Sequence, residues 1–361
     1  MPIRVLHVVT YMGRGGLETM LMNYYRHIDR DKVQFDFLVH RDFEADYDQE
    51  ILALGGKIYH LPPLNPIGRE YLLQLEAFFA EHREYKIVHC HLDCMAGIPL
   101  RMAKKYDVPI RIAHAHNSNQ IKNTKYLLKL FYRGIIPKYA TKLFACGDKA
   151  GTWMFRTKKF KVLNNAIDAK QYVYSSTVAA EVREMLGILP DELVCGHVGR
   201  FMTQKNHDFL LRVFAQMPDY TKLLLVGDGE LRKPMEKLAE ELGVRNRVLF
   251  MGIRDDVNRL LQAMDVFVFP SLFEGLPVSV IEAQAAGVPC ILSDQVSRES
   301  KLVDEVEFLS LNESTEAWVQ HILRYQPGSK ANTYGIICDA GYDIVKNAEW
   351  LQNFYLTEGK R

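Results

Sequence analysis

Residues 266–283 read VFVFPSLFEGLPVSVIEA, and this stretch decides the fold of the second half of the chain. Its first four residues have the length and apolar composition of a buried strand. Pro277 suits the first position of a helix, where its missing N–H costs nothing, and Gly287 suits the stop. We therefore expect a helix from Pro277 to Ala286. A strand followed at once by a short helix is typical of a sheet flanked by helices.

Two carboxylates, Glu274 and Glu282, lie eight positions apart in the same stretch. The amino end of a helix carries unpaired N–H groups and about half a positive charge, so the corner at Gly275, Leu276 and Pro277 is an expected anion site. The two carboxylates can accept hydrogen bonds from hydroxyl groups on either side of a bound phosphate. The alternative interpretation is that Glu274 is a solvated loop residue and that Glu282 lies on the exposed face of an amphipathic helix. The flanking strand, glycine and proline favour the binding site.

Short apolar runs alternate with amphipathic stretches along the whole chain, a pattern that predicts an α/β fold with open parallel sheets. At 361 residues the chain exceeds one typical core, which suggests two domains. The pattern loosens from about residue 163 to Pro190, where we expect a linker with the boundary near Asn165. A last amphipathic helix is expected from Gly341 to Tyr355. The expected division is 1–165, 166–340 and a C-terminal segment, 341–361.

The predicted strands fall into two sets. In the first half they are Arg4 to Val9, Gln34 to Val39, Lys57 to Leu61, Ile87 to His91, Ile110 to His114 and Lys142 to Cys146. In the second half they are Leu193 to Val198, Lys222 to Val226, Arg247 to Phe250, Val266 to Phe269 and Pro289 to Leu292. Helices are expected in the gaps, so each half predicts a sheet of its own.

The composition is that of an ordinary globular protein. Forty-five Lys and Arg against 44 Asp and Glu give a formal charge of +1, which excludes a whole-chain field that attracts nucleic acid. The six cysteines are scattered through apolar runs without zinc-ligand spacing, as expected for reduced core residues. No signal peptide and no run of about 18 apolar residues is present, so we expect a cytoplasmic protein.

Two glycine-containing loops follow predicted strands. GRGG at residues 13–16 opens a helix and lets backbone approach an anion, although it lacks the third glycine of a dinucleotide fingerprint and also fits a plain tight turn. The second loop, residues 199–206, carries Arg200 and Lys205 at the carboxyl end of a strand, where ligands bind in open α/β sheets. A guanidinium and an ammonium suit a diphosphate, and two surface cations are the alternative.

Further along, Gly227, Asp228 and Gly229 form another turn between a strand and a helix. Gly252 and Arg254 follow a later strand, where backbone could pair with the edge of a nucleobase. Both signals are weaker than that of the residue 199–206 loop.

Histidines cluster in the first half as two His-x-His pairs, His89 with His91 and His114 with His116. Alternate residues of a strand share a face, so each pair could chelate a metal. Because Asp93 is the one carboxylate close in sequence, we favour core or substrate-contact roles and expect no metal. His116 stands at the outer end of its strand and is the best candidate to face a ligand.

Residues 122–142 are basic and amphipathic, without acidic residues. The cations of this segment are Lys122, Lys125, Lys129, Arg133, Lys138 and Lys142, and they alternate with leucine and aromatic residues. Such a segment can lie on an anionic bilayer. A core-facing helix with a solvated basic face is an equal alternative.

Taken in order along nearly the whole chain, these motifs resemble the retaining glycosyltransferases of family 4, which have the GT-B architecture. The resemblance is carried by GRGG at 13–16, the 199–205 loop, GDG at 227–229, PSLFEGLP at 270–277 and Glu282 with Ala283. Residues 112–118 and the Ser293-Asp294 region are more similar to the branch that builds capsules and exopolysaccharides. Asn165-Ala166-Ile167-Asp168 departs from the usual Asn-Gly-Ile-Asp of the family.

This resemblance implies a nucleoside diphosphate sugar held between two Rossmann-like domains, and a last helix that returns to the first domain. It assigns the diphosphate to Arg200 and Lys205, the ribose hydroxyls to Glu282, and the transferred sugar to Glu274. The implied contacts of the donor also include Gly275, Leu276, Gly15, Gly16 and His116.

The reaction implied is attack by an acceptor hydroxyl on the anomeric carbon from the face that the diphosphate leaves, with no metal or other cofactor. The donor is expected to be a UDP-sugar and the acceptor a glycan or a lipid-linked saccharide, with possible membrane contact through residues 122–142. One alternative is a non-catalytic protein that binds a sugar nucleotide and assists another transferase. A dinucleotide oxidoreductase and a pyridoxal-dependent phosphorylase fit less well. The sequence does not decide the sugar, the base, the acceptor or the oligomeric state.

Overall fold

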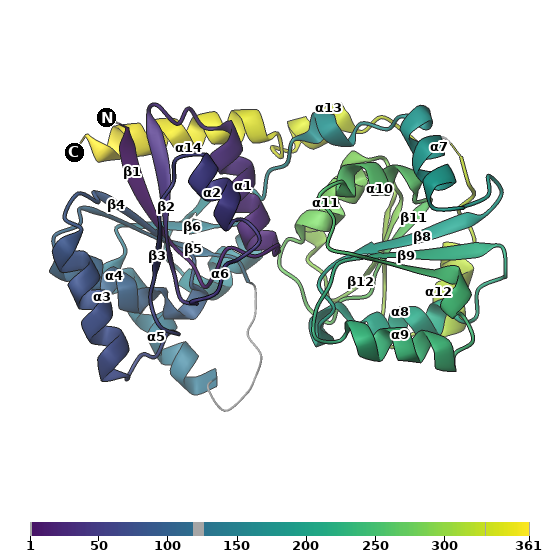
Figure 1. Ribbon diagram of the computed structural model, residues 1–361, viewed down its shortest axis with the longest axis horizontal. Coiled ribbons are helices and arrows are strands. Elements are labelled where there is room, and N and C mark those ends of the chain that lie inside the picture. Colours follow the sequence, from purple (N-terminus) through teal and green to yellow (C-terminus); the bar gives the residue numbers. More distant parts are fainter. Residues whose placement is uncertain (1, 118–125, 329, 361) are drawn as a thin grey trace. The chain divides into compact units, whose positions relative to one another are not determined.

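The computed structural model describes residues 2–117, 126–328 and 330–360. The chain divides into two compact units, unit 1 (Met1–Ala166 with Ile344–Arg361) and unit 2 (Ile167–Asp343). Unit 2 therefore begins one residue later than the expected residue 166. It ends three residues later than the expected residue 340. Each unit has a parallel sheet with helices on both faces (Figure 1).

Within its described residues, unit 1 holds a seven-stranded sheet in the order β3-β2-β1-β4-β5-β6-β7. The strands are β1 (Ile3–Val8), β2 (Val33–Val39), β3 (Ile58–His60), β4 (Ile87–Cys90), β5 (Ile110–Ala115), β6 (Lys142–Ala145) and β7 (Lys161–Val162). The helices are α1 (Gly16–His27), α2 (Asp48–Ala53), α3 (Arg69–Glu81), α4 (Gly97–Lys105), α5 (Tyr126–Tyr139), α6 (Asp148–Phe155) and α14 (Ile344–Gly359).

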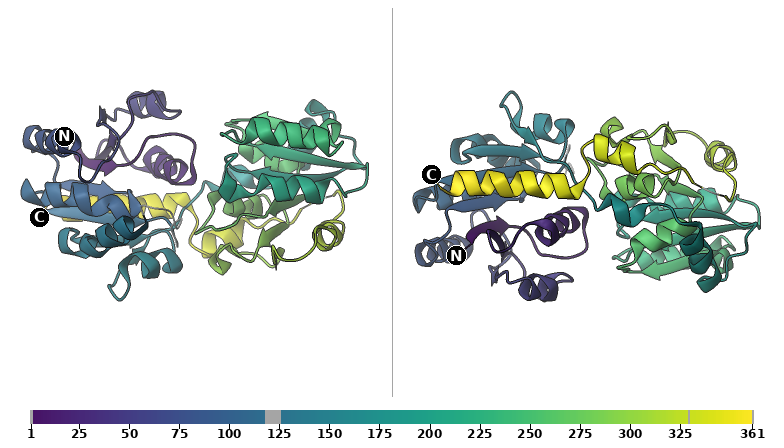
Figure 2. Two further views of the ribbon diagram at one scale, coloured as in Figure 1. Left: turned by 90° about the horizontal axis from the view of Figure 1, so that it is seen from below. Right: turned by 90° about the horizontal axis from the view of Figure 1, so that it is seen from above.

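The last helix, α14, is part of the core of unit 1. It packs against α1 and the strands β1 and β2 (Figure 2). Its buried residues Ile344, Ala348, Leu351 and Tyr355 belong to the same apolar cluster as Phe35. The helix begins three residues later and ends four residues later than the expected Gly341 to Tyr355.

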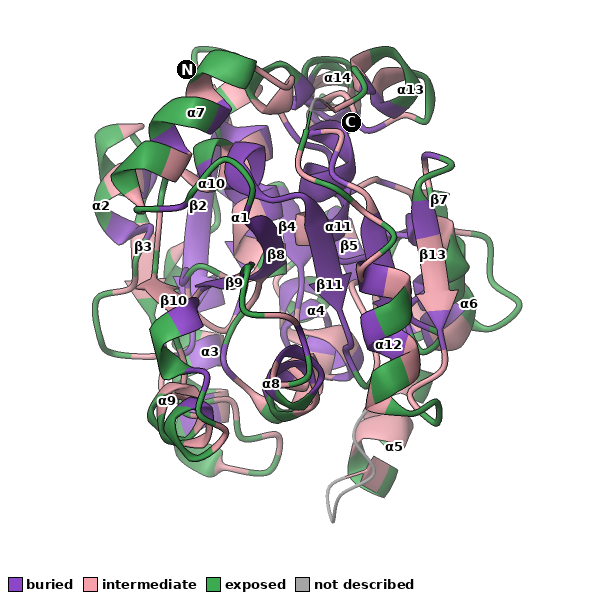
Figure 3. Ribbon diagram, turned by 90° about the vertical axis from the view of Figure 1, so that its right-hand side faces the viewer, coloured by how far each residue is buried: buried purple, intermediate pink, exposed green. Residues whose placement is uncertain are grey.

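The described part of unit 2 holds a six-stranded sheet in the order β10-β9-β8-β11-β12-β13. The strands are β8 (Leu193–Val198), β9 (Thr221–Val226), β10 (Val248–Gly252), β11 (Val266–Phe269), β12 (Cys290–Ser293) and β13 (Val306–Leu309). The helices are α7 (Ser176–Met185), α8 (His207–Phe214), α9 (Arg232–Glu241), α10 (Val257–Ala263), α11 (Val278–Ala285), α12 (Thr315–Ile322) and α13 (Tyr334–Asp339). The central strands β8 and β11 are buried, as Figure 3 shows.

The α/β fold with two parallel sheets and a returning C-terminal helix is confirmed. Two short strands, β7 and β13, were not predicted, because each is short and contains charged residues. The helix after Pro277 runs from Val278 to Ala285, so Pro277 precedes its first residue rather than forming it. Within the described residues, no helix is both long and apolar enough to span a bilayer.

Candidate active site

The site in unit 2 is formed by loops at the carboxyl ends of β8 and β11. Lys205, in the loop after β8, donates a hydrogen bond from Nζ to Oε1 of Glu274, in the loop after β11, over 2.7 Å. The two side chains are 16% and 11% exposed, so this ion pair is largely removed from water. The sequence predicted both residues for the site but not their pairing.

Further hydrogen bonds tie the two loops together. The side-chain amide of Gln204 donates a hydrogen bond to the Phe273 carbonyl over 2.9 Å. The backbone carbonyl of Gln204 accepts one from the backbone N–H of Leu272 over 2.8 Å. Asn206 donates to the Pro270 carbonyl over 3.1 Å. The residues on either side of Lys205 are therefore bonded to the backbone of the loop that carries Glu274, which fixes the positions of both side chains.

Glu282 lies inside α11, a helix with almost no exposed side. The residue is only 7% exposed, and its carboxylate accepts a 2.8 Å hydrogen bond from the hydroxyl of Tyr172. Burial raises the pKa of Glu282 to about 6, and the bond from Tyr172 opposes this rise. The alternative that Glu282 is an exposed helical glutamate is wrong. Gly275 and Leu276, between the two glutamates, are also buried.

Arg200 follows β8 but stands apart from this buried pair. It forms an ion pair with Glu230 at 3.5 Å, and the two side chains are 52% and 59% exposed. Such a solvated pair contributes little to stability, about 0 to 1 kcal/mol, and either partner can be redirected at small cost. The structure thus provides one fixed cation, Lys205, and one adaptable cation, Arg200, at the same sheet edge.

Glycines shape the neighbouring loops. Gly227 has φ +136°, and a Cβ there would meet the Gly199 carbonyl at 2.2 Å, so the loops after β8 and β9 touch backbone to backbone. The Gly227 amide donates to the Gly252 carbonyl over 2.8 Å. Arg254 forms a bidentate pair with Asp256, with N–O distances of 2.7 and 2.6 Å. Gly252 ends β10 and Arg254 follows this strand, at the place that the sequence predicted for both.

In unit 1, Gly15 precedes the first residue of α1, and Gly16 is that first residue. The Glu18 carboxylate folds back over Gly15, where a Cβ would lie 2.3 Å from it. The 13–16 segment therefore forms the expected glycine turn between a strand and a helix.

His116 lies just beyond β5 as part of a larger histidine cluster. His7 on β1, His89 on β4, His91 just after β4 and His114 on β5 line the same face of the sheet and are 0–3% exposed. His7 and His89 are register partners on adjacent strands. His7 was not among the residues predicted from the sequence, because a single histidine in an apolar strand resembles a core residue.

These histidines form two separate hydrogen-bonded series. His7 Nδ1 lies 3.0 Å from His91 Nε2, and His91 Nδ1 lies 3.0 Å from His116 Nε2. In the second series, His89 Nδ1 lies 2.7 Å from the Tyr355 hydroxyl, and His89 Nε2 lies 3.2 Å from His114 Nδ1. Burial lowers the pKa of all five imidazoles, to about 3 for His7 and His116, so the rings are neutral near pH 7.

Two triplets in this cluster have spacing suitable for a metal ion. Ligand atoms of His7, His89 and His91 lie within 4.8 Å of one another, and so do those of His91, His114 and His116. An all-imidazole set suits zinc, copper or nickel rather than magnesium or calcium. The same nitrogens already pair with one another at hydrogen-bond distance, which is sufficient to account for their positions.

The basic segment is described only from Tyr126 onward, so Lys122 and Lys125 lie outside the described residues. On α5, Leu127 and Phe131 are 78% and 65% exposed. Arg133 lies over the Trp153 ring at 4.7 Å. The alternative of an ordinary core-facing helix therefore leaves these two large apolar side chains unexplained.

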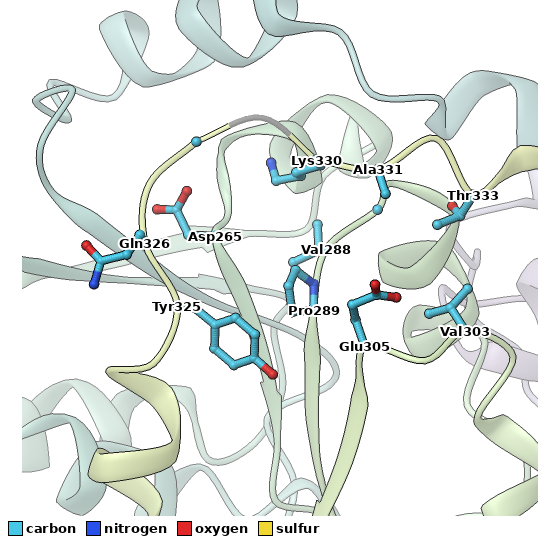
Figure 4. A pocket seen from close by; sticks show the side chains of 12 residues that line it. Asp265, Val288, Pro289, Val303, Glu305, Tyr325, Gln326, Lys330, Ala331 and Thr333 are labelled. Atoms are coloured by element: carbon cyan, nitrogen blue, oxygen red, sulfur yellow. The ribbon is translucent and has the colours of Figure 1, made fainter.

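A cavity of about 200 Å³ lies elsewhere in unit 2, at the amino ends of β11 to β13 (Figure 4). Asp265, Glu305, Tyr325 and Lys330 are among its lining residues, and burial lowers the pKa of Lys330 to about 8. None of the predicted site residues lines it. It is also smaller than the roughly 300 Å³ at which typical ligand pockets begin.

Comparison with known proteins gives matches over the whole chain. The family model described as glycosyl transferases group 1 matches residues 178–330, and that described as Glycosyltransferase Family 4 matches residues 14–171. EpsF of Bacillus subtilis (strain 168) is 36% identical over 370 residues, covering 98% of this chain and 96% of that protein. UDP-Gal:alpha-D-GlcNAc-diphosphoundecaprenol alpha-1,3-galactosyltransferase of Escherichia coli is 26% identical over 297 residues, covering 76% of each chain.

Solved structures show the same fold. Anabaena Alr3699/HepE in complex with UDP-glucose matches with a TM-score of 0.74 and 19% identity over 99% of this chain and 96% of that chain. WaaG, a glycosyltransferase involved in lipopolysaccharide biosynthesis, matches with a TM-score of 0.67 and 19% identity, over 99% and 98% of the two chains. Both matches extend through both sheets and α14.

Proposed function

The chain belongs to the group 1 and family 4 glycosyltransferases, and we propose that it is a retaining, metal-independent enzyme that uses a UDP-sugar. Its acceptor is a hydroxyl group of a glycan or a lipid-linked saccharide in surface polysaccharide synthesis. The named activity of the Escherichia coli relative and the UDP-glucose in the HepE structure support the choice of donor. The reaction takes place at the cytoplasmic side of the membrane.

The observation that carries this proposal is the buried Lys205–Glu274 pair. The Lys205 ammonium serves the leaving diphosphate, whose negative charge grows as the glycosidic bond breaks, and Glu274 holds hydroxyls of the transferred sugar. A fixed cation in a partly desolvated site stabilises developing charge far better than one in water. Because Glu274 orients Lys205 at 2.7 Å before the donor arrives, little reorganisation is required.

Other residues complete the donor contacts. Glu282 accepts hydrogen bonds from the ribose hydroxyls. The backbone amides of Gly275 and Leu276, just before the amino end of α11, also contact the donor. Arg200 adds a second charge to the diphosphate. On unit 1, we assign donor contacts to Gly15, Gly16 and His116, as the family resemblance implies.

The direct test is a thermal-shift panel of sugar nucleotides followed by a transfer assay with the nucleotide that binds. A ligand that binds only the folded state raises the melting temperature by mass action. We expect Lys205→Ala to lower turnover about 100-fold, on the scale of losing one preorganised donor. The loss for Arg200→Ala is expected to be smaller, because this side chain is half-exposed.

Lys233→Ala, on the exposed side of α9, is a matched control and should keep full activity. Unchanged turnover of Lys205→Ala at saturating donor would contradict the role of this ammonium. Donor binding without transfer or hydrolysis by the unmodified protein would instead favour the non-catalytic alternative.

Exposed apolar and basic residues on α5 support contact with an anionic membrane that holds a lipid-linked acceptor. Leu127 and Phe131 can enter the interface while Lys138, an exposed cation of the same helix, remains near lipid phosphates. Sedimentation with vesicles of anionic lipid, at low and high salt, tests this contact. A lack of salt-sensitive binding would contradict it.

A further inference from the structure

His116, like His91, lies one residue beyond the end of its strand, and its role depends on which ring nitrogen carries the proton. A neutral imidazole has one N–H donor and one bare acceptor nitrogen. The hydrogen bond made by one nitrogen determines the role of the other. Nε2 of His116 is engaged by His91 at 3.0 Å, so Nδ1 is the nitrogen left for a ligand.

The series His7–His91–His116 permits only two neutral proton arrangements. Each of its two nitrogen–nitrogen contacts, both 3.0 Å long, requires one shared proton. If the protons reside on Nδ1 of every ring, His116 presents an N–H donor and His7 Nε2 is bare. If they reside on Nε2 of every ring, His116 presents a bare nitrogen and His7 Nε2 carries the proton. The two ends of the series are therefore linked.

The inner end of the series lies in apolar surroundings. His7 is 0% exposed, its ring centroid lies 4.1 Å from that of Phe35, and among the described residues its buried Nε2 has no hydrogen-bond partner. Because this nitrogen is shielded from bulk solvent, the two arrangements differ in energy, and the surroundings of His7 select one of them. The rings are neutral because burial lowers the pKa of each, which preserves the one-proton count.

We propose that His7 and His91 are positioning residues that set, through two consecutive ring-nitrogen hydrogen bonds, which nitrogen of His116 carries its proton. The consequence for the reaction is that His116 meets a sugar hydroxyl of the donor in a single hydrogen-bonding role. This consequence rests on the proposed function, in which His116 contacts the donor sugar. The coupling among the three rings does not rest on it.

Substitutions at His7 separate this role from packing. His7→Phe keeps a flat ring beside Phe35 and removes an unpartnered buried nitrogen, so folding should be preserved. It also removes the bond to His91. His7→Asn packs less well, but it retains a polar atom near the position of Nδ1 and can restore that bond. We therefore expect lower activity from the better-packed variant.

The first measurement is the tautomer of His116, by long-range ¹⁵N–¹H spectra of histidine-labelled protein without ligand. We expect one tautomer in the unmodified protein and in His7→Asn, and a changed tautomer population in His7→Phe. His114→Phe is the matched control: it removes another buried nitrogen and keeps a ring packed on His116, where the two centroids lie 4.1 Å apart, but the hydrogen bond of His114 is to His89 and not to His116. The control should shift the His116 signals through the ring current of the new phenyl group and leave the His116 tautomer population unchanged.

The second measurement is kcat/KM for transfer. We expect kcat/KM to fall about 10-fold in His7→Phe, because a hydrogen bond of this kind is lost. In His7→Asn kcat/KM should return to the value of the unmodified protein, and in His114→Phe it should change less than twofold. An unchanged His116 tautomer in His7→Phe overturns the inference whatever the activity. A changed tautomer with full activity overturns the functional part. A metal ion bound stoichiometrically at His91 also overturns it, since a metal would replace the shared proton.

If the proposed function itself fails, the unmodified protein will transfer no sugar from any sugar nucleotide, and if only the donor contact of His116 fails, His116→Ala will retain full activity. The tautomer measurement still tests the coupling in that case, so the two failures can be told apart.

Discussion

The most direct consequence of the site geometry is that Glu282 should lower the stability of the unliganded protein. Its carboxylate is buried inside α11 and accepts a hydrogen bond from the Tyr172 hydroxyl, and charging it there is unfavourable. Glu282→Gln keeps the size of the side chain and an oxygen that accepts from Tyr172, but removes the charge. We expect this variant to be more stable than the unmodified protein above pH 7.

The magnitude follows from the pKa of Glu282. The ordinary value for glutamate is 4.5, and burial raises it to about 6. A difference of this size corresponds to about 2 kcal/mol between the protonated and ionised forms. Because the folded-state pKa is the higher one, the stabilising effect of the proton is fully present below pH 4.5 and is lost as the pH rises through 6. The glutamine variant has no such loss.

The assay is urea unfolding of both proteins at several pH values from 4.5 to 8, followed by a probe in unit 2. The two curves should agree near pH 4.5 and separate to about 2 kcal/mol at pH 8, which is roughly 5 °C in melting temperature for a unit of this size. Glu240→Gln, on the exposed side of α9, should follow the unmodified protein within about 0.5 kcal/mol.

Donor binding by Glu282→Gln should become weaker although the variant becomes more stable. If Glu282 binds the ribose hydroxyls, UDP will stabilise Glu282→Gln less than it stabilises the unmodified protein. A glutamine variant that is equally stable or less stable at pH 8, or a stability difference that does not vary with pH, would refute the reasoning about burial.

Three further outcomes are expected. Arg4→Ala should destabilise unit 1 by about 3 to 5 kcal/mol in urea unfolding, since it leaves the 0% exposed Asp36 carboxylate without its cation; a loss below 1 kcal/mol would contradict this. Gly227→Ala should greatly reduce UDP binding in calorimetry, because its Cβ would meet the Gly199 carbonyl at 2.2 Å, and normal affinity would refute the need for this contact. Phe131→Ser should weaken vesicle binding about 10-fold without changing turnover on a water-soluble acceptor, and undiminished binding would place the membrane contact elsewhere.

The sheets could be predicted from the sequence because each buried strand is a short apolar run between helical stretches. The strands that escaped prediction lie at or near sheet edges, where burial is weaker. For example, β13 reads VEFL and follows two acidic residues, so its apolar run is interrupted. In such strands the pairing partner, rather than the local composition, determines the structure.

The site could be predicted only in part. Lys205 and Glu274 carry local signals, since each stands in a loop after an apolar strand, but their pairing joins residues 69 positions apart. His7 carries no local signal. Its importance becomes visible only from the register of β1 against β4, which places it beside His89. Contacts of this kind depend on strand order, which a single sequence does not reveal.

The position of α14 affects how the chain is made. The helix supplies Tyr355 and Leu351 to the apolar interior shared with Phe35, yet it is synthesised only after the whole of unit 2. Unit 2, by contrast, is one continuous segment, Ile167–Asp343. On the ribosome, the part of unit 1 that precedes unit 2 must therefore wait until all of unit 2 and α14 have been synthesised to complete its core. A premature stop codon just before α14 would leave unit 2 intact and damage unit 1.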